Sequence, residues 1–475
     1  MKKSFATILL LSIAICVNAQ LSVPDIISSN MVLQASEPVA IWGKALKGEK
    51  ITVFYGKQKV KCNADRDGNW ELFLKPMQAS FTPQVLTIKG KRETLRMENV
   101  VVGEVWIASG QSNTQYPMLR EDRWMKLPLK GEELAAGELA KPANESIRVL
   151  ISGPRYKNHK WQVADGKSLE RVSAMGYFFI KNLQDSLNVP VGIITAALGG
   201  TRIEAWTKKE WYQQSPVFKD EIEKTERVDD FKPEECYRDY IAELVPYTLR
   251  GFIWYQGENN CGINDNRYAE KMRVLVSGLR SVFKTPNAPF NYVLLAPHVY
   301  SDRMHKGASK PTTAESLPRF REEQKNASEI IPNTDYVCIN DLVDNLRDIH
   351  PSYKWEVGKR LAKVALTKTY GRTGFEWTGP RLEKTINAGN SLLVTFSHVG
   401  QGLKSNDNKR IQWFEVAGDD GIFHPAYAEI EGKDQVKLKS DFVEKPTQVR
   451  FGWHETAQPN LINSEGLPAI TFGAN

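Results

Sequence analysis

The stretch Val101-Val-Gly-Glu-Val-Trp-Ile-Ala108, followed at once by Ser109-Gly-Gln-Ser-Asn113, decides the fold class. The first eight residues form a nearly continuous apolar run, which is typical of a strand buried on both faces of a parallel sheet. The next five are small or polar, and Gly110 permits a sharp turn there. Ligands of open α/β sheets bind beyond the carboxyl ends of the strands, so the turn is predicted to present Ser112 at a binding edge.

The chain downstream alternates between further strands and helices. Short apolar or β-branched runs predict four more strands, at 191–195, 251–255, 292–296 and 336–339. Helical patterns predict four helices, at 174–187, 241–249, 267–282 and 354–368. We expect Ser173 to cap the first of these helices, and Pro246 to kink or end the second. This alternation predicts a parallel sheet covered by helices on both faces, hence an α/β fold.

Both flanks of this region have the shorter periodicity of β structure. Residues 20–98 contain β-branched and aromatic runs with a turn signal about every ten residues, which predicts a small sandwich. After 371 the same pattern returns, with runs at 391–396, 435–439 and 447–451. We therefore expect an N-terminal β domain (20–98), a catalytic domain (99–370) and a C-terminal β domain (371–475).

The first 19 residues have the features of a signal peptide. Lys2 and Lys3 precede an apolar stretch, and Val17-Asn-Ala19 is a small-residue cleavage site. We expect cleavage after Ala19 and export to the periplasm or the extracellular space. No later segment is apolar enough for a membrane span. The formal charge of +7 is not clustered into a basic tract, so no nucleic-acid partner is expected.

Four cysteines remain after cleavage, namely Cys62, Cys236, Cys261 and Cys338. None forms a CxxC pair or has metal-ligand spacing with histidine, so neither a metal site nor another cofactor is predicted. A disulfide between Cys236 and Cys261 is one possibility in an oxidising compartment, and buried free thiols are the other.

Three more polar clusters follow predicted strands. Leu198-Gly-Gly-Thr201 offers backbone N–H donors in a tight turn, and Tyr255-Gln-Gly-Glu-Asn-Asn260 concentrates amides of the kind that stabilise an oxyanion. The third cluster, 344–351, ends in His350 and Pro351. Proline favours extended backbone at the residue before it, where side chains two apart face the same way. Asp348 is therefore expected to face His350, as a serine's base requires.

Several sequence blocks resemble those of SGNH-type hydrolases, and most closely the sialate O-acetylesterase-like branch. The blocks are Asn30–Gln34, Gly103–Trp106, Gly110–Asn113, Gly199–Trp206, Trp254–Glu258, Ile349–Pro351 and Gly466–Phe472. The resemblance covers nearly the whole mature chain. It implies a three-layer α/β/α catalytic domain with a parallel sheet, flanked by β-sandwich-like modules. It also implies a serine mechanism without a metal.

The resemblance assigns roles to individual residues. Ser112 is the expected nucleophile and, through its backbone N–H, one oxyanion donor. Gly199 or Gly200 supplies a second donor, and a side-chain amide a third, where we favour Gln256 over Asn260. His350 is the expected base.

The acid of the triad departs from the superfamily pattern, which has aspartate three residues before the histidine. Arg347 occupies that position here. Asp348, Asp344 or no carboxylate at all, with a backbone carbonyl orienting the ring, are the alternatives.

Three residues are candidates for substrate binding, namely Arg202, Glu258 and Trp254. Arg202 would meet a sugar carboxylate, or else form an internal ion pair, and Trp254 would stack on a sugar, or else fill the core. The predicted function is that of a secreted sialate O-acetylesterase acting on O-acetylated sugars or glycans. The alternatives are an acetylxylan or pectin acetylesterase, and a non-catalytic carbohydrate-binding protein on an esterase scaffold. The sequence leaves the oligomeric state open.

Overall fold

The computed structural model describes residues 20–124, 135–156, 160–219, 222, 225–302 and 304–474. The predicted signal peptide lies outside the described residues. Within these ranges, no helix is long and apolar enough to cross a membrane.

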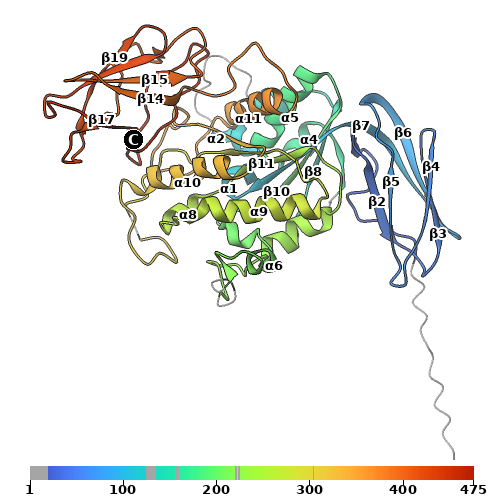
Figure 1. Ribbon diagram of the computed structural model, residues 1–475. Helices are drawn as coiled ribbons and strands as arrows, with labels where there is room; N and C mark the ends of the chain where they lie inside the picture. Colours follow the sequence, from blue (N-terminus) through green and yellow to red (C-terminus); the bar gives the residue numbers. More distant parts are fainter. Residues whose placement is uncertain are drawn as a thin grey trace, which may run out of the picture.

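A mostly parallel sheet forms the centre of the molecule, in the order β13-β12-β11-β7-β10-β8-β9 (Figure 1). Its strands are β7 (Thr94–Gly110), β8 (Asn144–Ile151), β9 (Gln162–Ala164), β10 (Val191–Ala197), β11 (Gly251–Tyr255), β12 (Phe290–Val293) and β13 (Thr334–Val337). Only β9, at one edge, runs antiparallel to its neighbour. Because β7 is central and parallel to β10 and β11, the turns after these three strands meet at one edge.

Helices cover both faces of this sheet (Figure 1). On one face, α5 (Ala174–Leu187) packs against α11 (Lys354–Lys368), so closely that a Cβ at Gly358 would lie 2.7 Å from the carbonyl oxygen of Met175. On the other, α9 (Tyr268–Val282) packs against α10 (Ser316–Ile330). Ser173 caps α5 by accepting the N–H of Gly176 at 3.1 Å. The expected three-layer α/β/α arrangement is confirmed.

Some predicted elements differ from those observed. The helix expected at 241–249 is wrong: a short π-helical turn (Tyr237–Ile241) and a 3-10 turn (Ala242–Leu244) precede Pro246, which lacks the N–H that a longer helix needs. The strands expected at 292–296 and 336–339 end earlier, at Val293 and Val337. Helix α10 was not predicted, although Pro318 in its first turn is typical of a helix start.

The N-terminal β module shares its core with the catalytic region. It contains β1 (Val32–Gln34), β2 (Val39–Lys44), β3 (Lys50–Tyr55), β4 (Gln58–Asn63), β5 (Asn69–Leu74) and β6 (Ser80–Lys89). The first half of β7 pairs with β6, and its second half pairs with β10 and β11. The boundary expected at 98–99 thus falls inside a strand, and one cluster of buried side chains runs through both parts.

The C-terminal β module has a core of its own. One sheet consists of β14 (Arg381–Asn387), β15 (Leu392–Ser397), β20 (Gln435–Lys439) and β19 (Tyr427–Glu431). Three shorter strands, β18 (His424–Pro425), β17 (Phe414–Ala417) and β21 (Gln448–Phe451), form a second sheet. A two-stranded pair, β16 (Lys404–Ser405) with β22 (Leu461–Ile462), completes the module. The expected flanking β modules are therefore present at both ends of the described chain.

Candidate active site

The turn that carries Ser112 is built on Gly110, where a larger side chain would not fit. Gly110 has φ +136°, and a Cβ there would lie 2.2 Å from the carbonyl oxygen of Tyr255. Ser112 then begins the short helix α1 (Ser112–Gln115). Its backbone N–H belongs to the first turn of that helix, so it has no acceptor within the helix and is available to a ligand.

The Gly199–Gly200 turn after β10 lies directly against the serine. A Cβ at Gly199 would lie only 3.1 Å from the Cβ of Ser112. The N–H of Gly199 donates to Oε1 of Gln115 at 2.9 Å. Gly200 has φ +76°, has open space at its Cβ position, and its N–H meets no acceptor among the described residues. Of the two glycines, Gly200 therefore has the N–H that is free to bind an oxyanion.

His350 lies in the loop between β13 and α11, with Asp348 as its nearest carboxylate. Oδ1 of Asp348 lies 3.4 Å from Nδ1 of His350, longer than the 2.6–3.2 Å expected of a tight hydrogen bond. The same oxygen accepts the backbone N–H of His350 at 2.9 Å. Asp344 is engaged elsewhere, since its Oδ1 accepts the hydroxyl of Tyr353 at 3.0 Å. Asp348 is thus the carboxylate that approaches the ring.

The surroundings of His350 keep its imidazole neutral. Burial is the main cause that lowers its pKa from the ordinary 6.5 to about 4, and the positive charges of Arg120 and Lys354 lower it further. Asp348 opposes this shift without reversing it. A neutral ring nitrogen is the form that accepts a proton from a serine hydroxyl.

Asn113 connects the nucleophile turn to the loop of His350. Its Nδ2 donates to the backbone carbonyl of Ile349 at 3.0 Å and to Oε1 of Glu258 at 2.5 Å. Glu258 is only 3% exposed, and burial raises the pKa of its carboxyl to about 7. The residue after the serine is therefore bound to the residue before the histidine, which places the Ser112 and His350 segments side by side.

Two buried charged residues, Lys354 and Glu121, support the same loop. Lys354 Nζ donates to the carbonyl of Pro351 and lies 4.6 Å from the ring centroid of Tyr116. The carboxylate of Glu121 accepts the backbone N–H of Lys354 at the start of α11. Burial lowers the pKa of Lys354 to about 8. These contacts fix the chain segment that follows His350 against the segment that follows Ser112.

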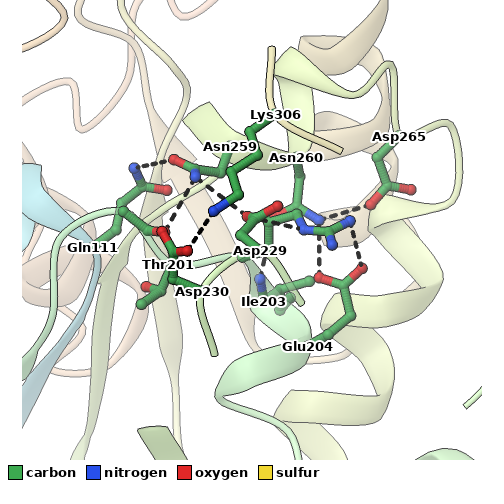
Figure 2. A network of polar contacts seen from close by, with 12 residues as sticks. Gln111, Thr201, Ile203, Glu204, Asp229, Asp230, Asn259, Asn260, Asp265 and Lys306 are labelled. Atoms are coloured by element: carbon green, nitrogen blue, oxygen red, sulfur yellow. Dashed lines mark hydrogen bonds and ion pairs between the residues drawn. The ribbon is translucent and has the colours of Figure 1, made fainter. Parts of the chain in front are cut away.

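The two side-chain amides expected to complete the oxyanion hole point inward. Gln256 Nε2 donates to Thr201 O and Gln111 Oε1, both at 3.1 Å, and to Asn260 Oδ1 at 2.8 Å. Asn260 Nδ2 donates to Glu204 and Asp265 (Figure 2). Neither Gln256 nor Asn260 is exposed. Internal acceptors take up the N–H groups of both amides in this structure, so an oxyanion role for either one stays a prediction.

The candidate substrate-binding residues are also mostly internal. Trp254 is 2% exposed, and its Nε1 donates to the hydroxyl of Tyr268, so its expected stacking on a sugar is wrong and the core alternative is correct. Glu258 serves Asn113, as described above. Arg202 forms the internal ion pair that was the alternative, from its Nε to Asp229 Oδ2 at 3.2 Å.

Figure 2 shows the polar network in which Asp229 lies, together with Gln111 and Asn259. Asn259 Nδ2 donates both to the carbonyl of Gly200 at 3.2 Å and to Asp229 Oδ2 at 3.4 Å. These contacts of Asn259 join the Gly200 turn and the segment after β11 to Asp229.

Comparisons with known proteins identify the family of this chain. Residues 102–367, more than half of the chain, match the family model described as carbohydrate esterase, sialic acid-specific acetylesterase. The chain belongs to this family of carbohydrate esterases. The sialate O-acetylesterases of Homo sapiens and Pongo abelii are each 27% identical to it over 427 residues, covering 81% of this chain and 78% of theirs. A solved carbohydrate acetylesterase from Xanthomonas citri superposes with a TM-score of 0.82, at 29% identity, covering 95% of this chain and 99% of that one.

The sequence alone did not indicate three residues of this carbohydrate esterase site, namely Asn113, Glu121 and Lys354. Asn113 stands in the quoted Gly-Gln-Ser-Asn block, but nothing local to it indicates a hydrogen bond to residue 349. Both Glu121 and Lys354 are buried in the structure. In the sequence they are visible only as charged residues next to apolar ones, which is a weak indication that they are buried and in contact. Their partners are more than 200 positions away in the sequence, so only the fold reveals them.

The possible Cys236–Cys261 disulfide is not formed. Cys62, Cys236, Cys261 and Cys338 are all free thiols, and all but Cys62 are buried. Burial raises the pKa of Cys261 well above its ordinary value, so this thiol is not reactive at neutral pH.

Proposed function

We propose that the protein removes O-acetyl groups from sialic acids, with Ser112 as nucleophile and His350 as general base. The observation that carries this proposal is the hydrogen bond from Asn113 to the carbonyl of Ile349, which joins the serine turn to the histidine loop. The sialate O-acetylesterases to which the chain is similar, and the family to which it belongs, favour a sialic acid as the acetylated sugar.

The reaction follows the usual course of a serine esterase. Ser112 Oγ attacks the acetyl carbonyl carbon while neutral His350 accepts the hydroxyl proton. The backbone N–H groups of Ser112 and Gly200 stabilise the oxyanion, each contributing about 3 kcal/mol. His350 then protonates the leaving sugar oxygen, and a water molecule hydrolyses the acetyl-enzyme by the same route. In this proposal Asp348 orients the imidazole through its contact with Nδ1.

We also propose that the protein is exported and that cleavage after Ala19 leaves Gln20 at its start. The features of residues 1–19 support this location. Intact-mass measurement of protein from the periplasm or the medium tests it, and a retained Met1 would contradict it.

The serine assignment is tested by Ser112→Ala. We expect turnover of an aryl acetate to fall by several orders of magnitude, because the acyl-enzyme no longer forms. Ser309→Ala is the matched control, since Ser309 is exposed and is expected to leave turnover unchanged. Retention of more than about a tenth of the activity by Ser112→Ala would overturn the assignment.

Substrate preference is tested by acetate release from 9-O-acetylated sialic acid, acetylated xylo-oligosaccharides and acetylated pectin. The proposal expects the highest kcat/KM on the sialic acid. A xylan or pectin acetylesterase would use the same catalytic residues, so a preference for either of those substrates would replace the sialate specificity and leave the mechanism intact.

A further inference from the structure

Two cavities adjoin at the edge of the sheet opposite Ser112. One, of 670 Å³, is lined by residues just before β11, β12 and β13, including Arg250 and Pro289. The other, of 710 Å³, lies between the N-terminal β module and the segments before β11 and β12. Lys284 lines both cavities, so they adjoin at this residue, and we call the two together the basal groove.

The basal groove has aromatic side chains on its β-module side. Trp42 and Trp70 come from the paired strands β2 and β5, where Gly43 lies opposite Trp70. Trp42 is half-buried, with its ring edge-on to Tyr247 at 6.4 Å between centroids. The indole Nε1 of Trp70 is buried, and no described residue accepts its hydrogen. Because Trp70 is 3% exposed and lies in the core, Trp42 is the indole that offers a face to a ligand, and an indole face of this kind is typical of carbohydrate sites.

The catalytic-domain side of the groove offers polar groups that lack partners. Asn291 is 2% exposed, and its Nδ2 has no acceptor among the described residues. Thr285 Oγ1 is likewise buried without a partner. A buried polar group without a hydrogen-bond partner is unfavourable, so both groups favour a ligand that supplies hydrogen bonds. Asn291 alone offers two donor hydrogens.

The charges along the groove are already compensated. Arg250 is paired with Glu104 and Glu37, and Lys284 Nζ lies 2.7 Å from Glu71. Lys368 lies 3.7 Å from Asp335. The groove therefore has little excess charge to attract an anion, and its donors suit a neutral ligand rich in hydroxyl groups.

We propose that the basal groove is a second binding site, for a neutral oligosaccharide, that is separate from the catalytic centre. Strands β11, β12 and β13, which begin at the groove and end at the edge that carries the Ser112 turn, are four or five residues long, which corresponds to roughly 13–17 Å at 3.3 Å per residue. A sugar unit bound at Ser112 thus does not reach the groove. The groove holds a different part of a glycan and keeps the esterase on it. This site does not depend on the specificity proposed above.

Calorimetric titration of the full chain carrying Ser112→Ala tests the site without turnover. The probes are xylohexaose, cellohexaose and mannohexaose, with an α2,8-linked sialic acid hexamer as the anionic contrast. We expect at least one neutral hexaose to bind, and Trp42→Ala to weaken that binding at least tenfold. Phe442→Ala, an exposed aromatic of the C-terminal module, is the matched control and should leave the affinity unchanged.

Lys284→Ala is a second variant in case Trp42→Ala disturbs folding, because its side chain is half exposed. We expect it to weaken binding several-fold, and to leave aryl acetate turnover by the enzyme with Ser112 intact within twofold. Binding of none of the neutral hexaoses, binding of the sialic acid hexamer alone, or affinity insensitive to both variants would each overturn the site. Because this readout is affinity and not hydrolysis, its failure would leave the proposed esterase specificity standing.

Discussion

At the scale of single residues, the site depends on how burial changes the properties of ordinary side chains. Burial is the main cause that lowers the pKa of His350 and keeps its ring neutral. Burial also raises the pKa of Glu258, to about 7. Asn113 contacts both segments, so a single amide orders the serine turn and the histidine loop. The chemistry of this site is thus set less by which residues are present than by what surrounds them.

The lowered pKa of His350 predicts activity in acid. The neutral ring is the form that acts as the base. We therefore expect kcat/KM to keep its full value at pH values well above the pKa of about 4, and to fall as the pH drops through that pKa. An unperturbed histidine would lose activity near pH 6.5. The pH profile of kcat/KM on an aryl acetate, whose own protonation does not change, measures this limit.

Arg120→Met extends the same test, because the positive charge of Arg120 lowers this pKa. The acid limb should move to higher pH in this variant. Arg319→Met, which removes an exposed arginine, is the control and should not move it. An acid limb near pH 6.5 in the parent enzyme would show that His350 is more hydrated than its burial indicates.

Asp348 is predicted to assist the base without being indispensable. Its contact with Nδ1 is 3.4 Å long and its side chain is 42% exposed, unlike the buried carboxylates whose loss costs on the order of 10⁴-fold. We expect Asp348→Asn to lower kcat/KM by about 100-fold, and Asp344→Asn, which keeps an acceptor for Tyr353, to stay within about threefold. Equal effects of the two substitutions would indicate a dyad of Ser112 and His350 alone.

At the scale of elements, the turn after β10 requires glycine at two positions for different reasons. Gly199 lies against Ser112 and Gln115, with ordinary φ, whereas Gly200 has left-handed φ and open space around it. At position 199 neighbouring side chains leave little room for a Cβ. At position 200 the left-handed backbone conformation disfavours any residue other than glycine.

Substitution of each glycine by alanine should distinguish the steric requirement at 199 from the backbone requirement at 200. A Cβ at Gly199 would lie 3.1 Å from Ser112 Cβ and 3.3 Å from Gln115 Oε1, so Gly199→Ala should displace the nucleophile and lower kcat at least tenfold with little change in Tm. Gly200→Ala should instead cost about 1–2 kcal/mol of unfolding free energy through backbone strain. Thermal unfolding and steady-state kinetics of both variants measure the difference, and a reversal of the two effects would refute it.

Sequence reasoning located the elements better than it located the contacts of the site. The helices at 174–187 and 354–368 were predicted to the residue, because apolar periodicity and the cap at Ser173 are local signals. The contacts of Gln256 could not be predicted, because its amide is directed to acceptors supplied by Gln111 and Thr201, which are far away in the sequence. A side chain's identity is local information, whereas its direction depends on the packed fold.

At the scale of the whole molecule, the two β modules are attached in different ways. The N-terminal module shares β7 and a continuous buried cluster with the catalytic region, and the hydroxyl of Tyr247 donates across to the carbonyl of Val32. The C-terminal module has a separate cluster. It contacts the catalytic region through polar groups such as Glu455, which accepts the N–H groups of Tyr300 and Ser301, and through Trp377 and Ile470, which pack into the catalytic cluster. The first module should therefore unfold with the active site, and the second should unfold largely by itself.

Two leucine-to-alanine substitutions test this difference in coupling. Leu33 and Leu438 are both 0% exposed, the first in the shared core and the second in the C-terminal core. Each substitution should cost about 2–5 kcal/mol in the unit that contains it. In Leu33→Ala, loss of aryl acetate activity should therefore occur at a clearly lower urea concentration than in the parent. In Leu438→Ala, the urea midpoint of activity loss should change by no more than the equivalent of about 0.5 kcal/mol. The unfolding transition seen in the tyrosine and tryptophan fluorescence of the C-terminal module should instead shift to lower urea. Equal shifts of the activity midpoint in both variants would mean that the C-terminal module unfolds together with the catalytic core, in spite of its separate apolar cluster.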